Sequence, residues 1–180
     1  GAVIPYGVGV DIGCRMCLTV YDLPGELAIS DQTRLSGFLR KNTAFGEGQL
    51  DHPFDDAILE HETFRLLPEA KRLRDKAARQ IGSSGGGNHF VEFGIADIPN
   101  KNRWGIPGRR YLAVLSHSGS RGMGAALAMH FTKVAMQETR LPKAQKNLAW
   151  LRLDSDAGRA YWAAMQLAGD YATACHDHIH

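Results

Sequence analysis

Three glycine-rich segments, each next to a short apolar stretch, constrain the fold of this chain more than any other feature. They cover residues 7–14, 82–92 and 116–124. Clustered glycines cost backbone entropy, so they are expected where the backbone needs a positive φ or passes close to a ligand. We therefore expect a framework of short strands whose ends carry glycine-rich loops, and such loops can direct polar side chains at a ligand.

The order of the predicted elements indicates an α+β fold. The chain has 180 residues, of which 44% are hydrophobic, and this is enough to bury the core of one domain. The residue patterns predict strands over 2–23, 89–95 and 111–115, loops over 42–54 and 97–109, and helices over 31–41, 55–65, 68–81, from 119–124 to about 140, and 156–180. Because strands and helices mix without strict alternation, we predict one domain over residues 1–180, with mixed sheets and flanking helices.

Bulk properties exclude some classes of protein. No apolar run approaches the ~18–20 residues that span a bilayer, so we expect no membrane partner. The 21 Lys and Arg against 19 Asp and Glu give a net charge of +2, which alone makes no electrostatic case for nucleic acid. Cys14, Cys17 and Cys175 are expected to be reduced thiols in a cytoplasmic protein. The chain starts on an apolar stretch and stops within a helical pattern, so we expect it to belong to a longer polypeptide.

The first glycine-rich segment offers two side chains of the kind that bind metals. Asp11 and Cys14 are three residues apart, and Gly13 permits the turn that would bring them together. A turn aspartate and a buried cysteine are the plainer interpretation. Cys14 and Cys17 also form a C-x-x-C pattern. Residues three apart in a strand point to opposite faces, so we interpret this spacing as coincidental.

The other two segments each contribute a histidine. His89 follows Asn88 where the second segment meets an apolar strand, a position at which a lone histidine is more often structural. His117 follows a buried strand and precedes a helix, whose free N–H groups and dipole favour an anion. Arg121, in the same segment, can bind a phosphate through two N–H groups. The spacing matches neither the Walker A motif nor the dinucleotide fingerprint.

Taken together, the three segments predict a site for a metal ion and a nucleotide. They supply Asp11, Cys14, His89 and His117 beside glycine-rich loops. Thiolate and imidazole ligands suit zinc or another first-row metal better than magnesium. Taken singly, each of these segments is better explained by a structural role, so the hypothesis depends on all four residues meeting in space.

The same segments, in the same order, resemble the motifs of the RtcB family of tRNA-splicing RNA ligases. The resemblance is carried by residues 7–14, 85–92 and 117–122, and it runs through nearly all of the chain. It implies an enzyme that depends on GTP and two manganese ions. Such an enzyme joins an RNA 3′-phosphate or 2′,3′-cyclic phosphate to a 5′-hydroxyl, in tRNA splicing or RNA repair. In that chemistry a histidine is guanylylated, GMP passes to the RNA 3′-phosphate, and the 5′-hydroxyl displaces it.

The resemblance also implies roles for individual residues. Asp11 and His89 would hold one manganese ion, His117 would hold the other, and Cys14 would bridge both. Contacts with GTP would come from the stretch Asn88, His89, Phe90, Val91 and Glu92. Arg121 is our own candidate for a phosphate contact, because it stands at the start of the predicted helix.

The chain departs from the family pattern in two respects. The guanylylated histidine and a further metal-binding histidine belong to motifs in the family's C-terminal half, which the terminal His176, His178 and His180 do not match. Ala174-Cys175-His176 stands where many members have Ala-Asn-Arg. We therefore expect this chain alone to lack the nucleophile and to form no GMP adduct. The alternative hypotheses are a metal-dependent phosphoesterase and a fragment that binds metal or RNA without turnover.

Overall fold

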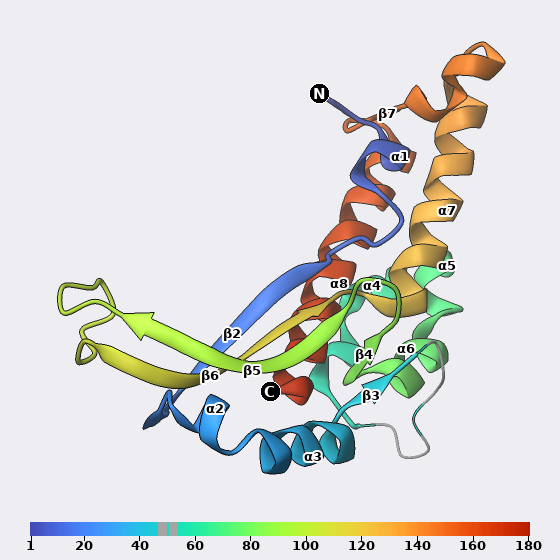
Figure 1. Cartoon of the computed structure of the whole chain (residues 1–180). Coiled ribbons are helices and arrows are strands. Elements are labelled where there is room, and N and C mark those ends of the chain that lie inside the picture. The colour runs from blue at the N-terminus through green and yellow to red at the C-terminus, as the bar shows by residue number, and fades with distance from the viewer. Residues whose placement is uncertain (47–49, 51–53) are drawn as a thin grey trace.

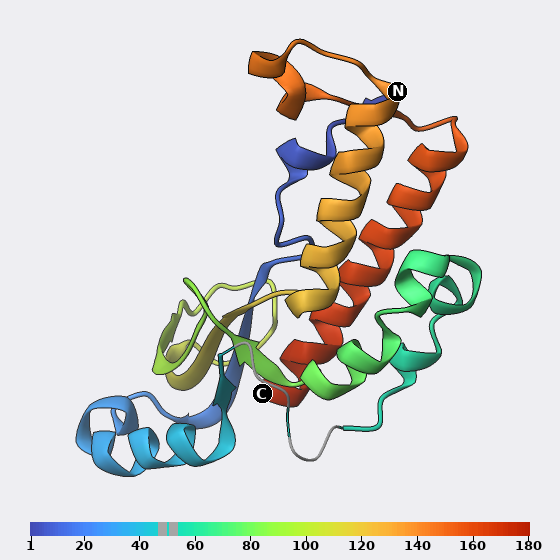
Figure 2. The same ribbon diagram turned by 90° about the vertical axis from the view of Figure 1, so that its right-hand side faces the viewer.

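Two long helices that lie side by side are the main elements of the fold. The computed structural model describes residues 1–46, 50 and 54–180, and within them the longest elements are α7 (Arg121–Glu138) and α8 (Asp156–Ile179). Both views show the two helices next to each other (Figures 1 and 2). Both helices were predicted from the sequence, and the 3.6-residue spacing of apolar side chains on α8 explains its buried face.

A three-stranded antiparallel sheet lies against one end of the helix pair. Its order is β2 (Arg15–Pro24), β6 (Arg109–Ser118) and β5 (Phe90–Ile98), so β6 is the central strand. The apolar run of β6 is buried from Tyr111 to Val114, which confirms the buried strand predicted there. The register places Cys17 opposite Ser116 and Phe90 opposite His117. Paired residues of neighbouring strands share a face of the sheet, so this register decides which side chains meet.

Short elements complete the fold. The two-stranded sheets are antiparallel β1 (Ala2–Val3) with β7 (Leu151–Arg152), and parallel β3 (Ala44–Phe45) with β4 (Ser83–Gly85). The short helices are α1 (Pro5–Val8), α2 (Leu27–Ser30), α3 (Gln32–Asn42), η1 (Ala57–Glu60), α4 (Glu62–Leu66), α5 (Pro68–Lys71), α6 (Arg74–Gln80) and η2 (Lys143–Leu148). Small sheets with helices around them confirm the predicted α+β class. No helix in the described part of the chain has both the length and the apolar character of a membrane span.

The strand predicted over residues 2–23 is wrong for residues 4–14. Pro5 occupies the first position of α1, where its fixed φ suits a helix. Gly9 and Gly13 then take φ values of 100° and 80°, which a continuous strand does not contain. A Cβ atom on Gly13 would lie 2.8 Å from the carbonyl oxygen of Ala168, so this turn packs directly against α8. The irregular segment thereby holds Asp11 and Cys14 beside the start of α7.

Two further predictions need correction. The helices expected over 55–65 and 68–81 are each divided in two, as η1 and α4 and as α5 and α6. His61 has an extended ψ of 133° and its ring accepts a hydrogen bond from the Thr63 N–H, so it begins a new helix and does not continue η1. The loop predicted over 42–54 contains β3, and its residues 47–49 and 51–53 lie outside the described part.

The core between α8, α7 and the short helices contains two buried tyrosines whose hydroxyl groups differ in hydrogen bonding. Tyr161 and Tyr171 are both fully buried. Tyr171 donates a hydrogen bond of 2.7 Å to the Ala77 carbonyl, whereas the Tyr161 hydroxyl has no hydrogen-bond partner among the described residues.

We expect Tyr171→Phe to lower the free energy of unfolding by about 1 kcal/mol, since it removes one buried hydrogen bond. Tyr161→Phe should be neutral or stabilising, because it removes a buried hydroxyl that has no such bond to lose. Urea unfolding of both variants measures the difference. Equal losses in the two variants would contradict this interpretation of the core.

Candidate metal centre

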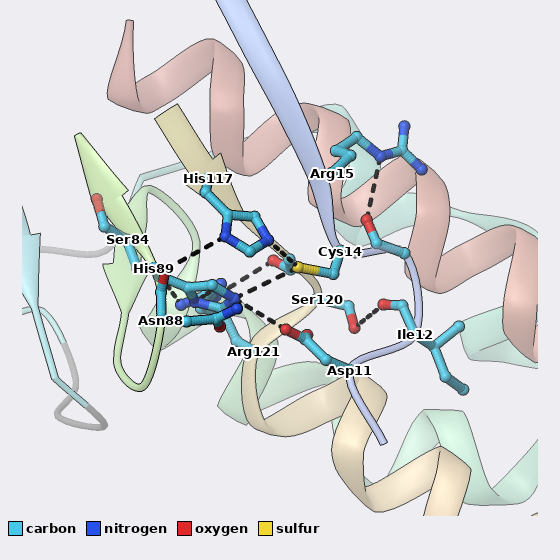
Figure 3. Close-up of polar contacts among 12 residues, drawn as sticks. Asp11, Ile12, Cys14, Arg15, Ser84, Asn88, His89, His117, Ser120 and Arg121 are labelled. Carbon is cyan, nitrogen blue, oxygen red and sulfur yellow. Dashed lines mark hydrogen bonds and ion pairs between the residues drawn. The ribbon is translucent and has the colours of Figure 1, made fainter. Parts of the chain in front are cut away.

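Four side chains from the three glycine-rich segments converge at one point, as Figure 3 shows. Asp11 and Cys14 come from the turn before β2, His89 precedes β5, and His117 is the second-to-last residue of β6. Cys14 Sγ lies 2.7 Å from His117 Nε2 and 3.5 Å from His89 Nε2. His89 Nε2 is also 2.8 Å from Asp11 Oδ2. The four residues predicted to bind metal are therefore brought together by the fold.

These atoms form a donor set that a metal ion could bind. The ligand atoms of Cys14, His89 and His117 all lie within 4.8 Å of one another, and Asp11 adds a carboxylate next to His89. The rings of His89 and His117 meet edge to face, with centroids 4.9 Å apart. One thiol, two imidazoles and one carboxylate are ligands that first-row divalent metals accept.

Cys14 holds its proton when no metal is bound. Burial of the side chain, followed by the hydrogen bond and the negative charge of Asp11, raises the pKa of the Cys14 thiol to about 11. A thiolate is the form that binds a metal, so an incoming cation must displace this proton. The half-exposed thiol is therefore kept neutral until positive charge arrives.

The hydrogen bond of His117 selects the tautomer that a metal ligand needs. Its Nδ1 lies 3.2 Å from the carbonyl oxygen of Asn88. A carbonyl only accepts, so the Nδ1 atom carries the proton and Nε2 presents its lone pair towards Cys14. A backbone carbonyl on the far ring nitrogen is the usual partner that orients a metal-binding histidine.

His89 is held from behind by Arg121. The Nη2 group of Arg121 lies 2.8 Å from His89 Nδ1. Because a guanidinium only donates, Nδ1 accepts this bond and the ring proton lies on Nε2, which donates to Asp11. For Nε2 to bind a cation as a neutral imidazole, the ring proton would move to Nδ1, and Nδ1 would no longer accept a hydrogen bond from Arg121.

Arg121 itself is fixed by the surrounding backbone. Its Nε donates to the Gly119 carbonyl and its Nη1 to the Ser84 carbonyl. Burial lowers the pKa of Arg121 from its ordinary value, while nearby acidic groups oppose that shift. It is also the non-glycine residue with a positive φ, at 56°, among the described residues. A residue other than glycine keeps such a conformation only where its surroundings hold it, and here three contacts do so.

Glycines give the room that this arrangement requires. A Cβ atom on Gly85 would lie 1.2 Å from Arg121 Nη1, and one on Gly119 would lie 2.5 Å from Asp11 Oδ1. Ser120 is the residue before α7, but its hydroxyl donates to the Ile12 carbonyl and does not cap the helix. The glycine-rich segments therefore allow side chains to approach the backbone closely at this site.

The stretch predicted to contact a nucleotide is divided between two faces. Asn88 is exposed, and its carbonyl holds His117. Phe90 pairs with His117 and its ring centroid is 6.0 Å from the histidine ring, whereas Val91 pairs with Ser116 on the opposite face. Strand alternation returns Glu92 to the face of Phe90. Of this stretch, the structure brings Asn88, His89 and Phe90 nearest to the four-residue cluster.

Cys14 and Cys17 form no pair, as the sequence predicts, but a second group of potential metal ligands was not predicted. Cys14 and Cys17 are both free, and they belong to different clusters. Cys17 lies with His176 and His180, and the ligand atoms of these three residues are within 4.8 Å of one another. The signal available in the sequence was the i, i+4 spacing of the two histidines, which places them on one face of a helix.

Comparisons with known proteins relate the chain to one protein family. The family model described as "tRNA-splicing ligase RtcB" matches residues 47–180. A protein named RNA-splicing ligase RtcB from Escherichia coli K12 is 29% identical over 98% of the chain, and a tRNA-splicing ligase RtcB from Thermococcus kodakarensis is 28% identical over 97%. An RNA-splicing ligase RtcB homolog from Entamoeba dispar is 23% identical over 96%. The chain spans 39–45% of the length of these relatives.

The family match covers most of the chain and includes His89, His117 and Arg121, while the alignments with the relatives extend over nearly all of it. These motif residues are also the ones that the fold gathers around Cys14. The chain belongs to the RtcB family.

Proposed function

We propose that this chain forms part of the active site of an RNA ligase and holds its metal ions. The observation that carries the proposal is the convergence of Asp11, Cys14, His89 and His117 from three separate segments. The relatives' names, which describe RNA-splicing and tRNA-splicing ligases, support the choice of RNA as substrate.

The donor set fits two divalent cations that share one ligand. Asp11 and His89, in contact through Oδ2 and Nε2, would hold the first cation. His117, whose Nε2 lone pair is directed at Cys14, would hold the second, and the Cys14 thiolate would bridge both. We assign manganese to these positions. Bound there, the ions would supply positive charge to neutralise phosphate oxygens and stabilise charge at a reacting phosphorus.

Residues beside the cluster would bind and orient the nucleotide, which we propose to be GTP. Gly86, Gly87 and Asn88 are exposed next to His89, so a ligand can reach them. β5 is an edge strand, and half of its backbone N–H and C=O groups point away from β6. We propose GTP contacts for Val91, whose side chain faces away from His117, and for Phe90 and Glu92, which lie on the face of His117.

Arg121 would act on the site through His89. Its burial and its contact with His89 Nδ1 support a positioning role, in which it holds the imidazole ring beside Asp11 while no cation is bound. Its phosphate contact stays a prediction. The reaction would join an RNA 3′-phosphate or 2′,3′-cyclic phosphate to a 5′-hydroxyl through a guanylylated histidine, which the motifs of this chain do not supply.

The test is a ligation assay with the longer natural protein, because the chain spans less than half of its relatives' length. With manganese, GTP and RNAs that end in 3′-phosphate and 5′-hydroxyl, we expect a joined product that disappears when GTP is omitted. Mass spectrometry of the 180-residue chain incubated with GTP should show no covalent GMP.

Two other outcomes would replace the proposal. Hydrolysis of a phosphodiester without any need for GTP would indicate a metal-dependent phosphoesterase that uses the same ligands. Binding of manganese and GTP by the longer protein without any product would indicate a non-catalytic binding protein.

A further inference from the structure

The two faces of the three-stranded sheet carry separate groups of metal-binding side chains. His117 and Ser116 are neighbours on β6, so their side chains leave the strand in opposite directions. His117 joins the cluster with Cys14 and His89, whereas Ser116 faces the end of α8, near the C-terminus marked in Figure 1. Cys17 pairs with Ser116 in the register and therefore shares this second face.

The second face holds a thiol and two imidazoles in contact range. The ligand atoms of Cys17, His176 and His180 all lie within 4.8 Å of one another. In a tetrahedral zinc site such atoms are about 3.5 Å apart, so closure on an ion needs movements of about 1 Å. Nothing in the proposed ligase site uses these three residues.

Hydroxyl groups contact the ring nitrogens of both His176 and His180. Ser116 Oγ lies 2.7 Å from His176 Nδ1 and 2.7 Å from His180 Nε2. Thr19 Oγ1 lies 2.6 Å from His180 Nδ1. A hydrogen bond to one ring nitrogen helps to position a histidine whose other nitrogen binds a metal, and Ser116 provides such a contact to His176. His180 would exchange one of its two hydroxyl contacts for the ion.

The imidazole of His176 is the most deeply buried of the three groups. His176 is 2% exposed, and its Nε2 atom has no hydrogen-bond partner among the described residues. Leaving a buried polar atom without a partner is costly, and native proteins rarely do so without a reason.

We propose that Cys17, His176 and His180 form a second metal site, specific for zinc or a similar soft divalent ion. The set lacks the carboxylate that Asp11 supplies to the first cluster, so thiolate and imidazole favour zinc over manganese. On binding, the S–H bond of Cys17 breaks, a sulfur–zinc bond forms, and the proton goes to solvent. Three protein ligands leave a fourth position open for water.

Such an ion would tie the end of α8 to the sheet. Cys17 belongs to β2, while His176 and His180 lie in and directly after the last turns of α8. A site of this kind is separate from the ligase chemistry, so it can be tested whether or not that proposal holds.

The test uses Cys14→Ser, which removes the thiol of the first cluster. In this background we expect Co²⁺ to give a thiolate-to-metal charge-transfer band, and zinc to bind with one ion per chain and raise the Tm. Adding Cys17→Ser should abolish the band and the zinc-dependent Tm shift. Adding His176→Gln should weaken zinc binding at least about tenfold.

His178→Gln is the matched control, because His178 lies on the same helix but contacts Asp56 and stacks on Phe54. It should leave the charge-transfer band unchanged. Cys17 is only half-buried, so its serine variant is expected to fold even where a change at His176 does not.

Absence of the band from a folded Cys14→Ser chain would overturn the proposal. A band that survives in the variant with both Cys14→Ser and Cys17→Ser would do so too. Manganese binding by Cys17→Ser reports on the first cluster alone. It therefore separates failure of this inference from failure of the ligase assignment.

Discussion

Manganese affinity of the chain is expected to fall about tenfold for each pH unit, or roughly 100-fold between pH 8 and pH 6, through Cys14 alone. The pKa of this thiol is raised to about 11, so at every pH in that range the free chain holds the thiol proton. Binding requires the thiolate and releases the proton. Lower pH therefore opposes binding, and higher pH favours it.

Cys14→Ser provides the control for this prediction. The variant should bind manganese at least about tenfold more weakly at pH 8, since it loses the ligand shared by both ions. It should also release one proton fewer for each chain that binds metal. Isothermal titration calorimetry in buffers of different ionisation enthalpy measures both quantities.

Cys17→Ser should match the wild type in manganese affinity and proton release, because Cys17 lies on the opposite face of the sheet. A pH dependence unchanged by Cys14→Ser would show that the proton comes from another group, and Cys14 would no longer be assigned as the bridging ligand.

Gly85→Ala is expected to destabilise the fold by at least about 3 kcal/mol, the lower end of the cost of disrupting the partners of a buried charge. Gly85 has a φ of 80°, and a Cβ atom there would lie 1.2 Å from Arg121 Nη1. The positive φ alone costs about 1–2 kcal/mol for a residue with a side chain. The guanidinium cannot move freely, because it is buried and bonded to Ser84, Gly119 and His89.

Thermal unfolding measures this effect, and a loss of 3 kcal/mol corresponds to a fall in Tm of about 6–12 °C for a domain of this size. Gly86→Ala is the matched control, because a Cβ atom on the adjacent Gly86 would meet open space and its φ lies outside the left-handed region. That variant should stay within about 0.5 kcal/mol of the wild type. Similar losses for both alanines would show that Arg121 is not the cause.

The elements with strong local patterns were predictable from the sequence. β6 follows from its apolar run, and α8 follows from the helical spacing of its apolar residues. Where short-range signals conflicted, prediction failed. Residues 4–14 alternate like a strand, but Pro5, Gly9 and Gly13 bend the chain into a helical turn and a loop. That bend puts Asp11 next to Gly119, which a straight strand would not do.

The candidate site was also predictable only in part. The side chains with metal-binding chemistry could be identified at Asp11, Cys14, His89 and His117, because glycine-rich loops beside strands narrowed the choice. Their tautomers could not be predicted. The Asn88 carbonyl and the Arg121 guanidinium decide where the ring protons lie, and both contacts join residues about thirty positions apart.

The amino-acid pattern was sufficient to identify the side chains with metal-binding chemistry and the two long helices. Both predictions depend only on neighbours within a few residues. Which cysteine serves which cluster was decided only by the folded chain. Cys14 and Cys17 are only three positions apart in the sequence. The turn at Gly13 and the pairing of β2 with β6 nevertheless direct their side chains to opposite faces of the sheet. Side-chain direction in a sheet follows from register, and register is a long-range contact.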